Sequence, residues 1–193
     1  MIDFLPQTTT DPVHNGLPTI ASPAVPLRVD ILDRLQLLFE RMVFHQEFLF
    51  FGCELRFPAG VLCPPGNCLF IAFEQRFIGT LRSAGLNVHY AWSRDQENSE
   101  RNQRYSFIAL VGAPPGGQLP SCLHLAESVW HGAILGTGHG LARPLAGEGI
   151  LLHPEDPDFA ESLGHAFRAA SCLGRSETKR LAHPVNSFGS SRV

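Results

Sequence analysis

The chain has 193 residues, of which 44% are hydrophobic and 17% are charged, and its formal net charge is −3 at pH 7. This length predicts one globular domain with its own core, and the acidic balance does not favour a strong nonspecific DNA-binding protein. No apolar run approaches the roughly 20 residues that cross a bilayer, and the N-terminus lacks a secretory signal, so we expect a cytoplasmic protein without membrane contact.

The first 26 residues predict a flexible, Pro/Thr-rich arm. Proline recurs from Pro6 to Pro26, and the segment holds no lysine or arginine. Proline at this frequency does not fit a helix or a central strand. We therefore divide the chain into an extended arm over 1–26 and a single domain over 27–193.

The first half of the domain predicts a helix, a strand and a second helix. Apolar residues at spacings of three and four indicate a helix over 27–47. Alternation of apolar and charged residues at its end indicates a strand over 48–57. A four-residue apolar repeat then predicts an amphipathic helix from Asn67 to Gly85.

The second half predicts an antiparallel hairpin followed by two helices. The expected elements are a strand over 88–94, a polar connection over 95–103, a strand over 105–111, a helix over 124–135, an irregular Gly-rich loop over 136–149, a strand over 149–153 and a helix over 157–173. The glycines at 136–140 lack the Lys-Ser/Thr of a P-loop. Helices alternating with strands around a central hairpin predict an α+β fold, a central antiparallel sheet with helices packed on it.

The five cysteines do not suggest disulfides or a metal. Their number is odd and no Cys-x-x-Cys occurs, which favours free thiols in a reducing compartment. Cys63 and Cys68 have a spacing that zinc could use, but no Cys/His pair follows at finger spacing. We expect no cofactor.

Five stretches, taken together and in order, resemble one protein family. They are Cys53–Pro58, Tyr90–Gln96, Arg104–Leu110, Asp158–Lys179 and Ser187–Arg192. The chain resembles the inovirus-type replication proteins of filamentous phages and integrated elements, the group that contains the YagK/YfjJ proteins. The match covers about residues 49–192.

The resemblance implies the chemistry of HUH rolling-circle replication nucleases, with its key residues replaced. In that class, two histidines on a central strand bind a divalent metal, and a tyrosine on a later helix attacks the scissile phosphate. The histidine positions match Arg104 and Ser106 here, and the tyrosine position matches Cys172. The lysine that follows it matches Arg175.

These replacements imply a protein without nuclease activity. Arginine cannot ligate a cation, and serine is a weak neutral ligand. Glu54 and Asp95 remain as weak metal candidates. A buried cysteine such as Cys172 is more often an inert core residue than a nucleophile. We therefore expect no catalytic residues and no bound metal.

Binding of DNA without cleavage remains open, because a fixed arginine cation at the metal position can face a phosphate. The candidate contacts are Arg94, Arg104, Tyr105, Arg175, Lys179 and Arg192. The expected function is a catalytically inactive, replication-initiator-like domain that binds single-stranded or hairpin DNA, or regulates replication of a phage or mobile element. The alternatives are a protein-protein interaction module that uses the arm or the 136–149 loop, and an active metal-dependent nicking enzyme.

Overall fold

The computed structural model describes residues 6–58, 66–96, 103–114, 117–134, 141–176 and 187–192. No helix within these ranges is long and apolar enough to cross a membrane. The elements in chain order are β1 Thr8–Thr9, β2 Val13–His14, β3 Leu17–Pro18, β4 Leu27–Arg28, α1 Val29–Met42, β5 Phe48–Arg56, α2 Cys68–Ser83, β6 Asn87–Gln96, β7 Gln103–Gly112, α3 Cys122–Ala133, β8 Leu141–Pro144, β9 Ile150–Leu152, α4 Phe159–Ala170, the 3₁₀ turn η1 Ser171–Gly174 and β10 Phe188–Ser190.

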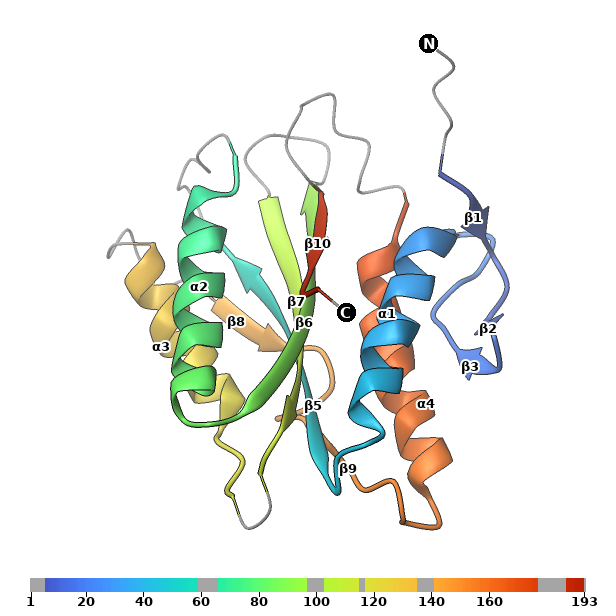
Figure 1. Ribbon diagram of the computed structural model, residues 1–193. Helices are drawn as coiled ribbons and strands as arrows, with labels where there is room; N and C mark the ends of the chain where they lie inside the picture. Colours follow the sequence, from blue (N-terminus) through green and yellow to red (C-terminus); the bar gives the residue numbers. More distant parts are fainter. Residues whose placement is uncertain are drawn as a thin grey trace.

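A six-stranded antiparallel sheet organises the domain. Its strand order is β10-β6-β7-β5-β8, and β9 pairs with the first residues of β5 while β8 pairs with the last ones. Helices α2 and α3 cover one face, and α1 and α4 cover the other (Figure 1). The predicted α+β class and central antiparallel sheet are confirmed, and β7 is the strand with long partners on both sides.

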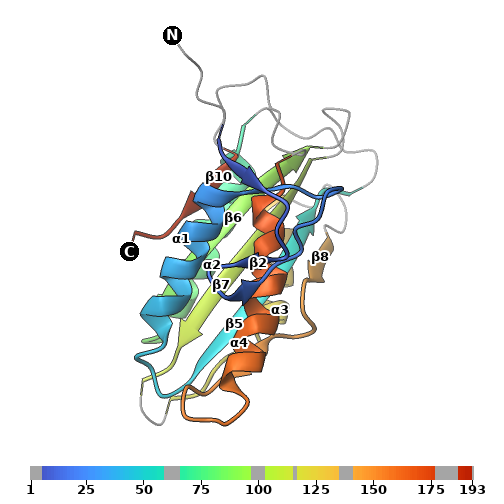
Figure 2. The same ribbon diagram turned by 90° about the vertical axis from the view of Figure 1, so that its right-hand side faces the viewer.

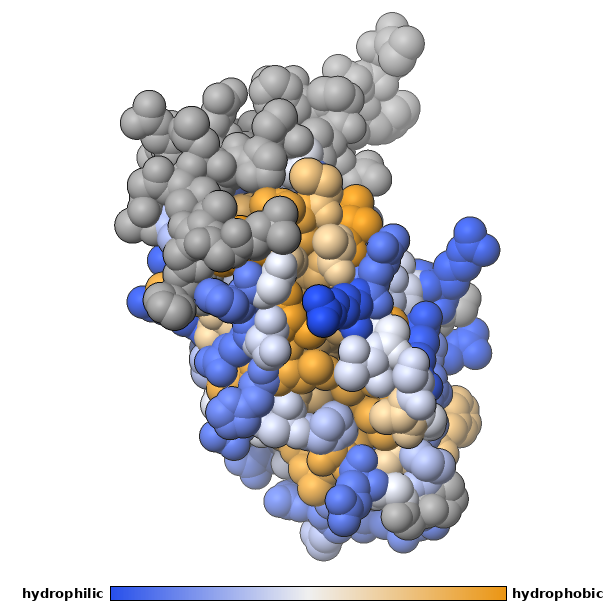
Figure 3. All heavy atoms as spheres, turned by 90° about the vertical axis from the view of Figure 1, so that its left-hand side faces the viewer, coloured by the Kyte–Doolittle hydropathy of each residue, from blue (hydrophilic) through white to orange (hydrophobic). Residues whose placement is uncertain are grey.

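Strand β7 is buried on both faces because it separates two apolar cores. Phe107 and Ala109 belong to the core under α2 and α3, whereas Ile108 and Leu110 belong to the core under α1 and α4. Successive side chains of a strand point to opposite faces, so a strand between two helical layers appears in sequence as a continuous apolar run. Viewed from the α2/α3 side, hydrophilic side chains cover the outer parts of the face, with apolar ones between them (Figure 3).

The N-terminal segment corrects the expectation of a flexible arm over its described residues. Strand β1 pairs with β4, and β2 pairs with β3. Thr19 and Ala21 are buried, and the backbone N–H of Ile20 donates to Ser171 Oγ at 3.0 Å. The segment lies across α1 and α4 (Figure 2). Residues 6–26 are therefore part of the domain's packing, and its core crosses the boundary that we placed at residue 27.

Two edge strands lie where the sequence did not predict strands. Strand β8 lies within the expected irregular stretch 136–149, and residues 135–140 are outside the described part. Strand β10 forms in the C-terminal tail and pairs with β6. The expected last helix ends at Ala170, so Cys172 lies in the 3₁₀ turn instead of a helix. The three- and four-residue edge strands are held by pairing with distant residues, which local periodicity does not encode.

Strand β10 depends on a glycine that lies against an indole ring. A Cβ added at Gly189 would lie 2.7 Å from Trp92 Cε2, so we expect Gly189→Ala to displace β10 and to lower the free energy of unfolding by about 1–3 kcal/mol. Gly79→Ala in α2 is the matched control, because its Cβ meets nothing within 4 Å. The control is expected to stabilise by about 0.5–1 kcal/mol. Urea unfolding measures both, and equal stabilities would contradict the close contact.

Candidate functional site: a charge cluster on the central strands

The strand register gathers polar residues on one face of the sheet. Arg104 on β7 lies opposite Arg56 on β5 and Asp95 on β6, and Ser106 lies opposite Glu54 on β5. Residues directly opposite in antiparallel strands share a face. Neighbouring positions on this face carry Ile108 and Leu110 of the α1/α4 core, so the polar residues continue that face toward one end of the sheet.

These five residues form an ion network, which we call the charge cluster. The Arg104 Nε lies 3.5 Å from Glu54 Oε2 and 3.8 Å from Asp95 Oδ2. Arg56 Nε donates to Glu54 Oε1 at 2.5 Å, and Ser106 Oγ donates to Asp95 Oδ2 at 3.5 Å. Two guanidinium groups therefore balance two carboxylates.

The charge cluster is largely buried. The side chains of Arg104, Glu54 and Asp95 are 14%, 15% and 1% exposed. Charges that leave water are stabilised only when opposite charges and hydrogen bonds surround them. The positive charge of Arg104 is thus compensated by two carboxylates of the protein itself. This arrangement does not favour its expected contact with a phosphate.

The residues present do not fit a divalent metal. Arg104 brings a fixed positive charge between the Glu54 and Asp95 carboxylates, where a cation would have to lie. Within the described residues, no group of three or more His, Cys, Asp or Glu side chains could hold a metal ion. The two weak metal candidates are instead partners of an arginine.

Cys172 lies in the core on the same side of the sheet. Its side chain belongs to the α1/α4 core and is 8% exposed. The other described thiols include Cys53 and Cys122, where burial raises the pKa, in Cys122 to about 12. A buried cysteine among apolar side chains is typical of a packing residue.

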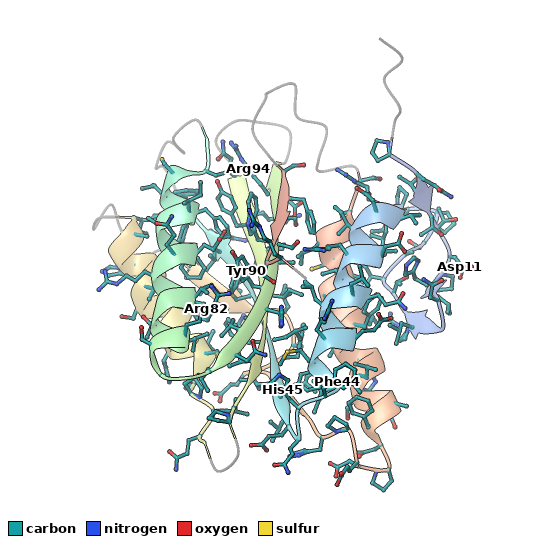
Figure 4. The ribbon with its side chains drawn as sticks, viewed as in Figure 1. Asp11, Phe44, His45, Arg82, Tyr90 and Arg94 are labelled. Carbon is teal, nitrogen blue, oxygen red and sulfur yellow. The ribbon has the colours of Figure 1, made fainter. Side chains whose placement is uncertain are left out.

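Arg94 and Tyr105 lie on the opposite face from Arg104. The Tyr105 ring is 1% exposed and stacks on Phe70 with ring centroids 4.4 Å apart. Its hydroxyl donates to Asn67 Oδ1 at 3.0 Å, and Arg94 Nη1 donates to the same oxygen at 3.4 Å. Arg94 is 4% exposed at the end of β6 (Figure 4). Neither side chain offers a surface on which a base can stack without opening the core.

The remaining candidates are scattered. Arg175 follows the 3₁₀ turn and bridges to Leu27, whereas Arg192 is exposed after β10. Lys179 lies outside the described residues. The described candidates occupy both faces of the sheet, so they do not form one continuous surface.

The sequence reasoning missed the role of Arg34 in holding the C-terminal tail. Its Nε donates to Ser190 Oγ at 2.8 Å, and its Nη2 donates to the Ser191 carbonyl at 2.5 Å. The Ser191 Oγ in turn accepts the Tyr90 N–H at 3.1 Å. The Ser-Phe-Gly-x-Ser-Arg tail thus fixes an edge strand between α1 and β6, a long-range pairing with no local signal.

Comparison of the chain with protein-family profiles, curated protein sequences and solved structures finds no significant match.

Proposed function

We propose that this protein is a catalytically inactive, replication-initiator-like domain of the HUH type that binds DNA without cutting it. The observation that carries the catalytically inactive part of the proposal is the Arg104 side chain, whose Nε lies 3.5 Å and 3.8 Å from two carboxylates at the position where the resemblance implies a metal. At this position the arginine charge takes the place that a bound cation would have between the two carboxylates.

Two further features support the proposal. Positions 104 and 106 share one face of a strand inside an antiparallel sheet, as two ligands of one metal must. The segment with Cys172 packs against the core of that same face. Arg104, Ser106 and Cys172 thus depart from the implied chemistry together, and an isolated substitution would not explain all three.

A salt-titrated binding assay tests the function. We expect the protein to bind single-stranded or hairpin DNA at low salt, with an affinity that falls steeply as salt rises, because phosphate neutralisation releases counterions. Fluorescence anisotropy with single-stranded, hairpin and duplex DNA measures this. A parallel incubation with Mn²⁺ is expected to leave the DNA intact.

Two results would contradict the proposal. Absence of binding to all three DNAs at low salt excludes the DNA function. Metal-dependent nicking that Cys172→Ala abolishes excludes the inactive assignment and supports an active enzyme.

A protein-protein interaction module is the second candidate, favoured by exposed apolar residues at the end of α1. Phe44 is 90% exposed, and Val43 and Leu37 are 40% and 45% exposed. A phenylalanine exposed to this extent is a candidate anchor for a partner protein, since aromatic side chains are enriched at protein–protein interfaces. Phe44 lies at the lower end of α1 in Figure 4. This candidate gains support if DNA binding is absent.

A further inference from the structure

Basic side chains gather around the first residues of β6, before the stretch that pairs with β10 and far from the charge cluster. They come from α1, the turn after α1, α2 and β6 itself, and we call them the β6-edge strip: Arg34, Arg41, His45, Arg82 and His89. His89 lies six residues before Asp95 on β6, which separates the strip from the charge cluster by about 20 Å.

Hydrogen bonds bring the strip together on this edge. Arg82 Nη2 donates to the Val88 carbonyl at 3.3 Å, and the His45 Nε2 lies 2.9 Å from Asn87 Nδ2. The His89 Nδ1 lies 3.5 Å from Ser191 Oγ. Arg82, His45 and Tyr90 all lie along β6 between α2 and α1 (Figure 4).

Helix α1 separates its charges between two flanks. Asp33 forms an ion pair with His14 of the N-terminal segment at 2.9 Å, and Glu40 accepts from Gln36 at 2.8 Å. Arg34 and Arg41, seven residues apart, share another flank of the helix, and Arg34 bonds to the tail beside β6. Asp33 and Glu40 therefore lie toward the N-terminal segment and the two arginines lie toward β6, while Asp30 in the first turn pairs with Arg28.

The positive charge of the strip is not neutralised by nearby carboxylates. In the described part of the chain, Arg34, Arg41 and Arg82 form no ion pair. Burial lowers the pKa of His89, and the positive fields of Arg41, Arg82, His45 and Arg34 lower it further. Glu74 lies beside Tyr90 and accepts its hydroxyl at 2.7 Å.

We propose that the β6-edge strip is the surface on which this protein holds the phosphate backbone of single-stranded DNA. The inference rests on the proposed function and moves its contact surface away from Arg104, whose charge is compensated inside the protein. Arg41 and Arg82 are exposed, one from each helix that flanks the start of β6, so a strand of DNA that crosses this edge can place phosphates against both guanidinium groups.

Tyr90 gives the surface its preference for single strands. Its half-buried ring lies on the α2 side of the sheet, with its centroid 6.3 Å from that of Phe107, and its hydroxyl donates to Glu74. An unpaired base can stack on such a ring, whereas a base inside a duplex cannot reach it. Basic groups that follow a backbone and an aromatic ring beside them are the combination that single-strand binding requires.

The test uses Arg41→Gln with Arg82→Gln in the full-length protein. We expect the slope of log affinity against log salt for single-stranded DNA to become shallower by about 0.7 for each lost phosphate contact, about 1.4 in total. The matched control is Arg76→Gln with Arg168→Gln, which removes the same charge from two exposed arginines outside the strip. The control is expected to keep the wild-type slope.

A separate variant tests the stacking surface. Tyr90→Leu is expected to weaken single-strand binding about 10-fold while the salt slope stays unchanged, because it removes no phosphate contact. Unfolding midpoints verify that each variant is folded at the assay temperature. An unchanged affinity in this variant overturns the role of Tyr90.

The outcomes separate the surface from the function. If the wild type binds and both arginine pairs change the slope equally, or neither changes it, the β6-edge strip is not the contact surface and the proposed function stands. If the wild type binds no DNA at low salt, the proposed function fails and this surface fails with it.

Discussion

Replacing Arg104 by methionine is expected to lower the free energy of unfolding by about 3 kcal/mol, because it leaves buried carboxylates with less compensating charge. Asp95 is 1% exposed and lies 3.8 Å from the Arg104 Nε. Glu54 keeps Arg56 as a partner, so Asp95 carries most of the cost. Urea unfolding followed by circular dichroism measures the loss.

A double-mutant cycle with Asp95→Asn assigns the cause. Once the carboxylate is neutral, Arg104→Met is expected to cost at least 1 kcal/mol less than in the wild type, since coupled residues show interaction energies of about this size. Were Arg104→Met to change stability by under about 0.5 kcal/mol, as surface substitutions do, the Arg104 charge would be solvated and able to meet a phosphate.

Replacing Tyr105 by alanine is expected to cost about 3–5 kcal/mol, the range for removal of a large buried aromatic side chain. The ring stacks on Phe70 and contacts Trp92 and Trp130 edge to face, with centroids 6.3 Å and 6.4 Å away. Its loss would leave a cavity at the centre of the α2/α3 core. Thermal and urea unfolding measure the effect.

Tyr105→Phe is the control that keeps the ring. It removes the hydroxyl that donates to Asn67 Oδ1 and is expected to cost only about 1 kcal/mol, because Arg94 also donates to that oxygen. DNA affinity is expected to be the same for Tyr105→Phe and the wild type. A Tyr105→Ala protein with normal stability but weaker single-strand binding would show that Tyr105 is a contact residue after all.

Much of the fold followed from local periodicity. Strand β5, helix α2 and strand β7 lie close to their predicted ranges, because each buries an apolar face whose spacing of two or four residues is written into the sequence. Because side chains alternate along a strand, Arg104 and Ser106 share one face of β7 and Tyr105 points to the other, although we had grouped Arg104 and Tyr105 as candidate DNA contacts. These statements need no partner strand.

The surroundings of those side chains came only from the tertiary structure. The sequence named Glu54 and Asp95 as acids near the expected site, but antiparallel pairing of β5, β7 and β6 brings them to Arg104. The same pairing places Arg94 beside Tyr105 in the other core. Arg104 and Arg94, which the sequence suggested as contacts for DNA, are therefore compensated or buried when strands distant in sequence pair.

The N-terminal segment and strand β10 also depend on contacts with residues far away in the sequence. Proline spacing predicted no regular element before residue 27, yet residues 6–26 lie across α1 and α4 and bond to Ser171 of η1, which is 151 positions from Ile20. Strand β10 forms because Gly189 pairs with Trp92 of β6 and because Arg34 of α1 donates hydrogen bonds to Ser190 and Ser191. Sequence alone set the faces of each long element, since side-chain direction follows backbone period; tertiary structure decided which charges are neutralised, since that depends on residues far apart in the chain.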